Sequence, residues 1–400
     1  MRREWLTRIS RMRSVGCATV ALFVLAIATV PASADTIRSQ QWYLDAMHAE
    51  EMWKTSTGAG VTVAVIDSGV DANLPDLQGQ VLPGKDFSGI EVDTPPDYDG
   101  HGTEMAVLIA GTGSSNGGRG SFGLAPGVKI LPLRVANDKA PRTKLLSGAT
   151  VYSAVRFAAD SDAKVINISM GMPAGDPEGA KAIEYALSKG KIIFASAGNR
   201  GDKGNDVEYP AAYPGVIGVA AVDQDIKATS WSHRGPEVDL AAPGDNMVAA
   251  CIGGTGLCRS HGTSDATALT SASAALLWSA HPDWTANQVL RVLINTAGGP
   301  KSGEKRSDSI GYGVVRPRIA LQNPGDPGPA DISPLPELAA AKSPADNAAK
   351  TAPPPASKQA DKADSSLLSK RTLIAVSVIV AAAAVTAAAV FTRRRRMPGN

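Results

Sequence analysis

Three side chains in this 400-residue sequence are of the types that together perform nucleophilic catalysis: Ser264, His101 and Asp67. A serine hydroxyl becomes reactive when a base takes its proton and a carboxylate holds that base in the correct tautomer. Ser264 begins "SDATALTSASAALLWS", a run of small residues that predicts a helix packed on all sides. A serine at a helix start is also a common N-cap, so its place alone leaves both roles open.

The candidate base is selected from the five histidines of the chain. His48 reads as a helix surface, His233 as part of a turn, and His281 as a helix end. His261 lies three residues before the candidate serine, which is too local for independent positioning. His101 follows "DYDG" and opens its own helix, and the glycine beside it leaves room for another chain segment. His101 is therefore the strongest candidate.

The candidate acid is Asp67, which ends the apolar strand "VTVAVID". A carboxylate at the end of a buried strand can cap a turn or serve a site. Apolar runs alternate with helical patterns along the chain, which indicates an α/β fold: a parallel sheet with helices on both faces. Strands are expected at 60–69, 128–136, 164–171, 191–199 and 215–223, and helices at 101–111, 145–163 and 180–190. In such sheets, functional groups gather beyond the carboxyl ends of the strands, where the three candidates would lie.

The motifs around these residues resemble those of the subtilases, the subtilisin-like serine proteases. The matching segments are "VAVIDSGV", "DGHGTEMA" and "HGTSDATA", in the order Asp, His, Ser that is typical of subtilisin. Further likeness lies in "VINISMG", "FASAGN" and "WSHRGPEVDLAAPG". The resemblance runs from about Gly60 to Thr296. An exported esterase is disfavoured, because it requires a Gly-x-Ser-x-Gly elbow and the order Ser, Asp, His.

The resemblance implies a role for each matched residue. Ser264 would attack a peptide carbonyl, His101 would carry the proton, and Asp67 would orient His101. Asn199 and the backbone amide of Ser264 would hold the oxyanion. Backbone for pairing with an extended substrate would come from Ser169, Met170 and Gly171. The chain departs from the common pattern at Glu104, where the family usually has His, and at 265–269, where it often has Met-Ala-x-Pro-His. These departures leave the three catalytic residues intact and bear on substrate preference and rate.

The two ends of the chain predict export and membrane anchoring. A basic start, an apolar core and "PASA" indicate a signal peptide cleaved after Ala34. The uncharged stretch 372–392 is long enough to span a bilayer, and Arg393 to Arg396 directly after it indicate a cytoplasmic end. The expected organisation is a signal peptide at 1–34, an N-terminal extension at 35–60, a peptidase domain at 61–322, a Pro/Ala-rich linker at 323–371, a transmembrane helix at 372–392 and a cytoplasmic tail at 393–400.

Charge and cysteine content limit the partners. The formal net charge is +2, without a basic stripe interleaved with aromatics, which argues against nucleic acid. Cys251 and Cys258 stand close together, and in an oxidising compartment such a pair usually forms a disulfide. Zinc held by this pair and His261 is the weaker alternative, because the spacing matches no common zinc pattern. No cofactor is expected; calcium is possible in this family, but no acidic loop here is diagnostic.

The whole arrangement resembles the mycosins, which are membrane-anchored subtilases associated with type VII secretion. The resemblance implies a serine endopeptidase on the outer side of the cell membrane, with protein substrates, lipid contact through its carboxyl-terminal helix, and association with a secretion complex. The alternative is a structural scaffold of that complex, built on a subtilase fold, whose cleavage is dispensable.

Overall fold

The structure is a computed structural model. It describes most of the chain between its two ends, namely residues 36–89, 96–135, 147–252, 256–336 and 338. The expected signal peptide, transmembrane helix and tail lie outside the described residues, as does the greater part of the expected linker. Within the described part of the chain, no helix has the length and apolar character needed to cross a bilayer.

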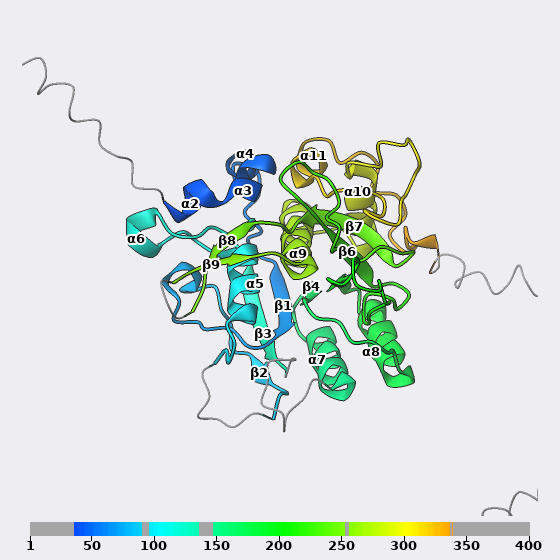
Figure 1. Cartoon of the computed structure of the whole chain (residues 1–400), viewed down its shortest axis with the longest axis horizontal. Coiled ribbons are helices and arrows are strands. Elements are labelled where there is room, and N and C mark those ends of the chain that lie inside the picture. Colours follow the sequence, from blue (N-terminus) through cyan, green and yellow to red (C-terminus); the bar gives the residue numbers. More distant parts are fainter. Residues whose placement is uncertain (1–35, 90–95, 136–146, 253–255, 337, 339–400) are drawn as a thin grey trace, which may run out of the picture. The chain divides into compact units, whose positions relative to one another are not determined.

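The centre of the described fold is a sheet of seven parallel strands in the order β2-β3-β1-β4-β5-β6-β7 (Figure 1). The strands are β1 Thr62–Asp67, β2 Lys85–Asp86, β3 Lys129–Arg134, β4 Val165–Ile168, β5 Ile192–Ser196, β6 Ile217–Val222 and β7 Val238–Pro243. A separate antiparallel hairpin is made by β8 Met247–Ala250 and β9 Leu257–Ser260. The predicted parallel α/β sheet is confirmed.

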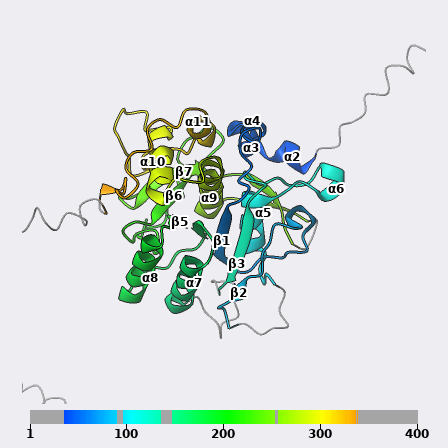
Figure 2. The same ribbon diagram turned by 180° about the vertical axis from the view of Figure 1, so that it is seen from behind.

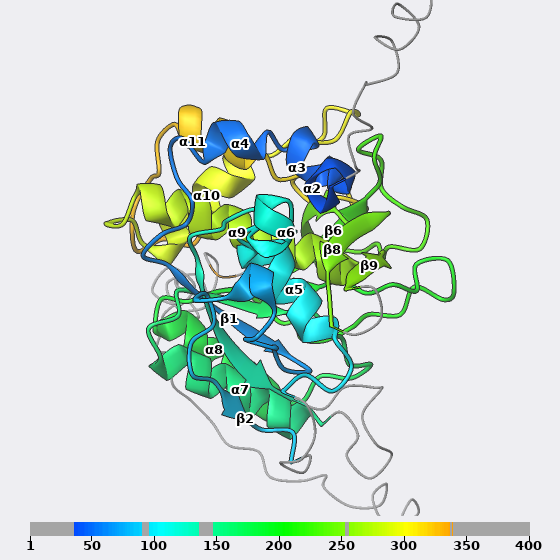
Figure 3. The same ribbon diagram turned by 90° about the vertical axis from the view of Figure 1, so that its left-hand side faces the viewer.

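The helices connect and cover these strands. They are α2 Ile37–Gln40, α3 Trp42–Ala46, α4 Ala49–Met52, the 3-10 helix η1 Pro75–Leu77, α5 His101–Ala110, α6 Ser115–Gly118, α7 Gly148–Asp160, α8 Pro177–Ser188, α9 Thr263–Ala280, α10 Ala286–Thr296 and α11 Pro317–Gln322. Helices α7 and α8 lie on one face of the sheet, and α5, α9 and α10 lie on the other (Figures 2 and 3).

Both faces of the sheet are buried, which explains the continuous apolar strands. Successive side chains of β1 alternate between two hydrophobic clusters: Val63 and Val65 pack on the α5 and α9 side, and Ala64 and Ile66 pack on the α7 and α8 side. All four are at most 1% exposed. Because β1 lies between β3 and β4, its carboxyl end at Asp67 lies inside the sheet rather than at an edge.

Helix α9 is buried along nearly its whole length, and its composition suits that position. Small side chains allow the sheet and neighbouring helices to approach closely. Its hydroxyl groups are satisfied locally: Thr267, Thr270 and Ser273 each donate to the carbonyl four residues earlier, at 2.7 to 2.8 Å. Because no buried hydroxyl of these three lacks a partner, the helix carries polar residues through the core at little cost.

The segment before β1 is part of the core. Gln41 and Tyr43 are fully buried, and the Tyr43 hydroxyl donates to the Val248 carbonyl at 3.1 Å. Ser56 donates to the Leu276 carbonyl in α9 at 2.7 Å. The residues of the expected N-terminal extension therefore contact both the hairpin and the central helix.

The sequence prediction missed the edge strands, β2 and β7, together with the β8–β9 hairpin. It included Pro132 in a strand, and the structure places this residue in β3 beside Val65 of β1. On the other side of β3, pairing with β2 begins only at Leu133. The imide nitrogen of Pro132 therefore leaves no gap in a continuous ladder.

The expected linker at 323–371 starts later than its composition indicates. The Arg291 guanidinium of α10 donates to the carbonyls of Pro327 and Ile332, each at 2.5 Å, and Leu335 is buried at 1% exposure. Proline lacks a backbone N–H but keeps its carbonyl acceptor. A neighbouring arginine can therefore hydrogen-bond to a proline-rich segment that forms neither strand nor helix. Residues 323–336 therefore pack on the folded domain, and the remainder of the expected linker lies outside the described residues, apart from 338.

Candidate active site

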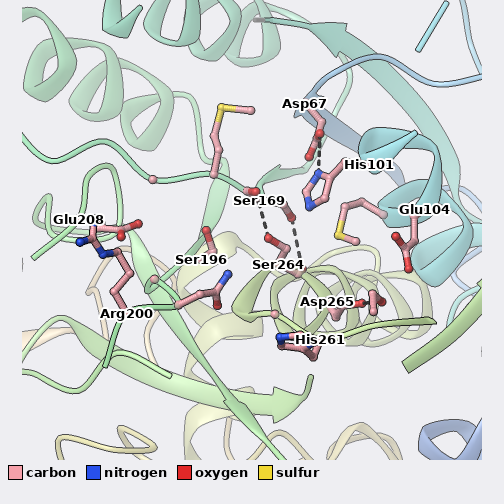
Figure 4. A pocket seen from close by; sticks show the side chains of 17 residues that line it. Asp67, His101, Glu104, Ser169, Ser196, Arg200, Glu208, His261, Ser264 and Asp265 are labelled. Carbon is pink, nitrogen blue, oxygen red and sulfur yellow. Dashed lines mark hydrogen bonds and ion pairs between the residues drawn. The ribbon is translucent and has the colours of Figure 1, made fainter. Parts of the chain in front are cut away.

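A cleft of about 460 Å³ lies at the carboxyl ends of β1, β4 and β5 (Figure 4). Its walls also include the first residues of α5 and α9 and the loop after β9. All seven of the candidate catalytic and substrate-binding residues line it: Asp67, His101, Ser169, Met170, Gly171, Asn199 and Ser264. Five separate segments of the chain thus converge on one site.

Asp67 and His101 are in direct contact within the site. His101 Nδ1 lies 2.8 Å from Asp67 Oδ1, which also accepts the Ser68 amide at 2.8 Å. Asp67 is 1% exposed, and its second carboxylate oxygen has no partner among the described residues. An ionised Asp67 accepts the Nδ1 proton, which leaves Nε2 of His101 free to act as a base.

The electrostatics of His101 result from two opposing effects. Burial lowers its pKa, but the charge and hydrogen bond of Asp67 raise it by more, so the pKa lies above the ordinary value of 6.5. The imidazolium form is therefore stabilised, as is required when the ring takes a proton during a reaction.

A buried network positions this pair. The Ser68 hydroxyl donates to Asp97 at 2.8 Å and accepts the Gly102 amide at 2.9 Å. Asp97, which is 1% exposed, also accepts the amide and hydroxyl of Thr103. A Cβ at Gly102 would come within 2.1 Å of the Gly69 carbonyl, so the expected close approach at this glycine is confirmed. The sequence pattern did not predict a role for Asp97, although this residue begins the segment "DYDG" directly before His101.

Ser264 is the second residue of α9 and is 8% exposed. Its hydroxyl donates to the Ser169 carbonyl at 3.1 Å, and Ser169 donates in return to the Ser264 carbonyl at 3.3 Å. Among the described residues, the structure shows no hydrogen bond between Ser264 and His101. In this arrangement the serine hydroxyl donates to Ser169 and not to His101. The start of an 18-residue helix also places a positive partial charge beside the hydroxyl.

Asn199 follows β5 and is held by the residue before the serine. Its Oδ1 accepts the backbone amide of Thr263 at 2.8 Å and the Thr263 hydroxyl at 2.9 Å. These two bonds use the acceptor end of the side chain. The amide group at the other end is left to donate, as an oxyanion site requires.

Residues 169–171 continue from the end of β4 along the cleft. Ser169 is fixed from behind by Asn167, whose amide donates to its hydroxyl at 2.9 Å. A Cβ at Gly171 would come within 1.8 Å of a Glu208 carboxylate oxygen, so a larger residue here would displace the end of the Glu208 side chain. Burial raises the pKa of Glu208.

Cys251 and Cys258 are joined by a disulfide that closes the β8–β9 turn, with their Cα atoms 5.7 Å apart. β9 then leads directly into Ser260, His261 and Gly262, which line the cleft. Among the described residues, no cluster of three or more His, Cys, Asp or Glu side chains could hold a metal ion. Because the disulfide joins β9 to the end of β8, it restrains the wall of the cleft that leads into Ser264.

The structure adds to the site several residues to which the sequence assigned no role. They are Glu104, Ser196, Arg200, Glu208, Ser260 and Asp265. For Glu104 and Asp265 a signal was present, since both are departures from the common subtilase pattern. Only the tertiary fold shows that these two residues lie together beside the catalytic candidates.

A search against known families identifies the fold directly. The model of the subtilase family, Peptidase_S8, matches residues 58–313. The chain is a subtilase. It thus belongs to a family of serine endopeptidases and is 35% identical to thermitase of Thermoactinomyces vulgaris over 65% of this chain and 88% of thermitase.

Among solved structures, this subtilase is similar to two mycosins. One is MycP1 from the ESX-1 type VII secretion system, with a TM-score of 0.62, 31% identity, and coverage of 76% of this chain and 91% of that one. The other is the MycP3 protease from the type VII (ESX-3) secretion system, with a TM-score of 0.59, 34% identity, and coverage of 70% and 87%. The subtilase is therefore related to the mycosins.

Proposed function

We propose that this subtilase cleaves peptide bonds with Ser264 as nucleophile, His101 as general base and Asp67 as the orienting carboxylate. The observation that carries the proposal is the 2.8 Å contact of His101 Nδ1 with the buried Asp67, in the same cleft as Ser264. This contact leaves Nε2 as the proton acceptor. His101 takes the serine proton as the hydroxyl oxygen attacks the carbonyl carbon, and then gives it to the leaving amine.

The tetrahedral intermediate requires donors for its negative oxygen. We assign this role to the Asn199 side-chain amide and the backbone amide of Ser264. Asn199 is suited to it because Thr263 occupies its acceptor oxygen. Water then attacks the acyl-enzyme in the same way, with His101 again as base. Each proton in this scheme moves between side chains, substrate and water, so no cofactor is assigned.

The acyl part of the substrate would lie along Ser169, Met170 and Gly171, pairing with their backbone as an added strand. These residues follow a strand and line the cleft beside Ser264. Before a substrate binds, the Ser169 carbonyl holds the serine hydroxyl. Binding would break this contact and turn the hydroxyl toward His101.

The setting of the enzyme is proposed from the chain ends and the mycosin likeness. A signal peptide at 1–34, a membrane helix at 372–392 and a cytoplasmic tail at 393–400 would place the peptidase domain outside the cell membrane. The neighbouring structures come from type VII secretion systems, and we propose the same association here, with a secreted protein as substrate.

The test is labelling of membranes that contain the full chain with a fluorophosphonate probe, which reacts with activated serines. Wild type should label, Ser264→Ala should not, and Ser279→Ala at the far end of the same helix should label like wild type. Equal labelling of wild type and Ser264→Ala, or none in folded wild type, would contradict the proposed triad. If secretion persists in cells that carry Ser264→Ala, the scaffold role operates independently of cleavage.

A further inference from the structure

Two buried carboxyl groups lie in the cleft beyond the residues used in the proposed mechanism. Glu104 is one turn after His101 on α5, and Asp265 directly follows Ser264 on α9. They are 8% and 2% exposed, and both line the cleft. The two positions are 161 residues apart in the chain, and the fold brings them together beside the nucleophile (Figure 4).

Among the described residues that line the cleft, no lysine or arginine lies beside this pair. The nearby cation is His101, and it lowers the pKa of Asp265 by less than burial and the charge of Glu104 raise it. Asp265 accepts the Ser260 hydroxyl at 2.6 Å, which is a neutral partner. Oε1 of Glu104 is buried and has no hydrogen-bond partner among the described residues. A buried carboxylate without a partner is costly, so an unpaired acceptor on a residue that lines a substrate cleft points to a donor supplied by the ligand.

The place of the pair in the cleft indicates which part of a substrate it meets. Glu104 and Asp265 lie on one side of Ser264, and Arg200 and Glu208 lie on the opposite side (Figure 4). Gly171, at the end of the segment assigned to the acyl part, approaches Glu208. The acyl part is thus directed away from the carboxyl pair, which leaves the pair on the side of His101 and the leaving amine.

The charges of the lining residues favour a cation there. Arg200 is the one lysine or arginine among the described residues that line the cleft, and it is at the opposite end. An ammonium or guanidinium group entering beside Glu104 would donate to its unpaired Oε1 and offset the repulsion between the two carboxylates. A lysine or arginine side chain carries such a group on a long apolar stem that can reach a buried acid.

We propose that Glu104 and Asp265 form a specificity site for a lysine or arginine side chain on the leaving-group side of the cleaved bond, at the first residue after it. This inference rests on the proposed function, because it assumes that Ser264 and His101 cleave peptides in this cleft. It assigns the two carboxyl groups to substrate selection.

The test is cleavage of a mixed peptide library by the detergent-solubilised full chain, followed by sequencing of the new amino termini. Wild type should place lysine or arginine after the cut about tenfold or more above glutamine, the scale expected for a desolvated charge pair. The double variant Glu104→Gln with Asp265→Asn should reduce this preference to about twofold or less. The control Glu178→Gln with Asp225→Asn removes two exposed carboxylates outside the cleft and should keep the wild-type preference.

Fluorophosphonate labelling of the same samples separates failure of the inference from failure of the proposed function. Labelled wild type that cuts without a basic preference, or a double variant that keeps the preference, would overturn the inference alone. Wild type that neither labels nor cuts would overturn the proposed function and the inference with it. A matched pair of quenched peptides, with lysine or glutamine after the cut, should show the same ratio in kcat/KM.

Discussion

Replacement of Asp265 by asparagine should stabilise the fold at high pH and have little effect at low pH. Burial, and then the charge of Glu104, raise the pKa of Asp265 from 3.8 to about 7, although its bond from Ser260 and the nearby His101 lower it. In the folded state this carboxyl thus keeps its proton to a higher pH than in the unfolded state. Its contribution to stability is full below the unfolded pKa and is lost as the pH rises through the folded pKa.

The magnitude follows from the two pKa values. They differ by roughly 3, and each pKa unit corresponds to about 1.4 kcal/mol, so the ionised group destabilises the fold by about 4 kcal/mol above pH 7. Asparagine has nearly the same shape, can still accept from Ser260, and never ionises. The free energy of unfolding of Asp265→Asn should therefore exceed that of the parent by up to about 4 kcal/mol at pH 8, and by little at pH 4.

The assay is urea unfolding of the full chain at pH 4, 6 and 8, with Ser264→Ala in every sample to prevent self-cleavage. Glu178→Gln is the control, since it removes an exposed carboxylate whose ion pair with Lys181 is worth about 0.5 kcal/mol or less. A stability difference for Asp265→Asn that is equal at pH 4 and pH 8 would refute the reasoning, as would a loss of stability at pH 8.

Three further predictions concern the proposed catalytic residues and the disulfide. Asp67→Asn should slow cleavage by about 10⁴-fold, as in the trypsin-type enzyme from which that figure comes. Asp67 raises the pKa of His101, and His101 must be unprotonated to act as a base. The acidic limb of the pH–rate profile should therefore move to lower pH in Asp67→Asn, and an unmoved profile would contradict this. Asn199→Ala should lower kcat by about 10² to 10³ with little change in KM, a magnitude known from subtilisin; a change in KM alone would argue against an oxyanion role. Replacing both Cys251 and Cys258 by serine should cost about 2 to 3 kcal/mol in thermal or urea unfolding, because the disulfide closes a short loop, and an unchanged midpoint would show that it does not constrain the unfolded chain.

The interior of the sheet could be predicted from the sequence because both of its faces are covered. The central strands are continuous apolar runs, and β1, β4 and β5 lie within the expected ranges. Edge strand β2 has two exposed residues, Lys85 and Asp86, and so carries no apolar signal. The composition of 323–336 predicted a linker, but Arg291 of α10 donates to backbone carbonyls of this segment. Such contacts leave no hydropathy pattern in the sequence.

The candidate site was predictable where each residue stands at the end of an element. Asp67, His101 and Ser264 do so, and the structure brings them to one cleft. Two features could not be read from local pattern. The rotamer that turns Ser264 to the Ser169 carbonyl depends on a residue 95 positions away, and the meeting of Glu104 with Asp265 depends on the packing of α5 beside α9.

The burial of the amino-terminal segment has a consequence for the order in which the domain can fold. Gln41 donates to the Phe122 carbonyl, Tyr43 to that of Val248, and Ser56 to that of Leu276. A chain that emerges amino end first, from a ribosome or through a translocation channel, presents this segment long before its partners. The partner carbonyls lie 81, 205 and 220 residues further along the chain, and such distant contacts form slowly. The segment therefore completes its contacts only after the chain has emerged as far as Leu276, near the end of α9.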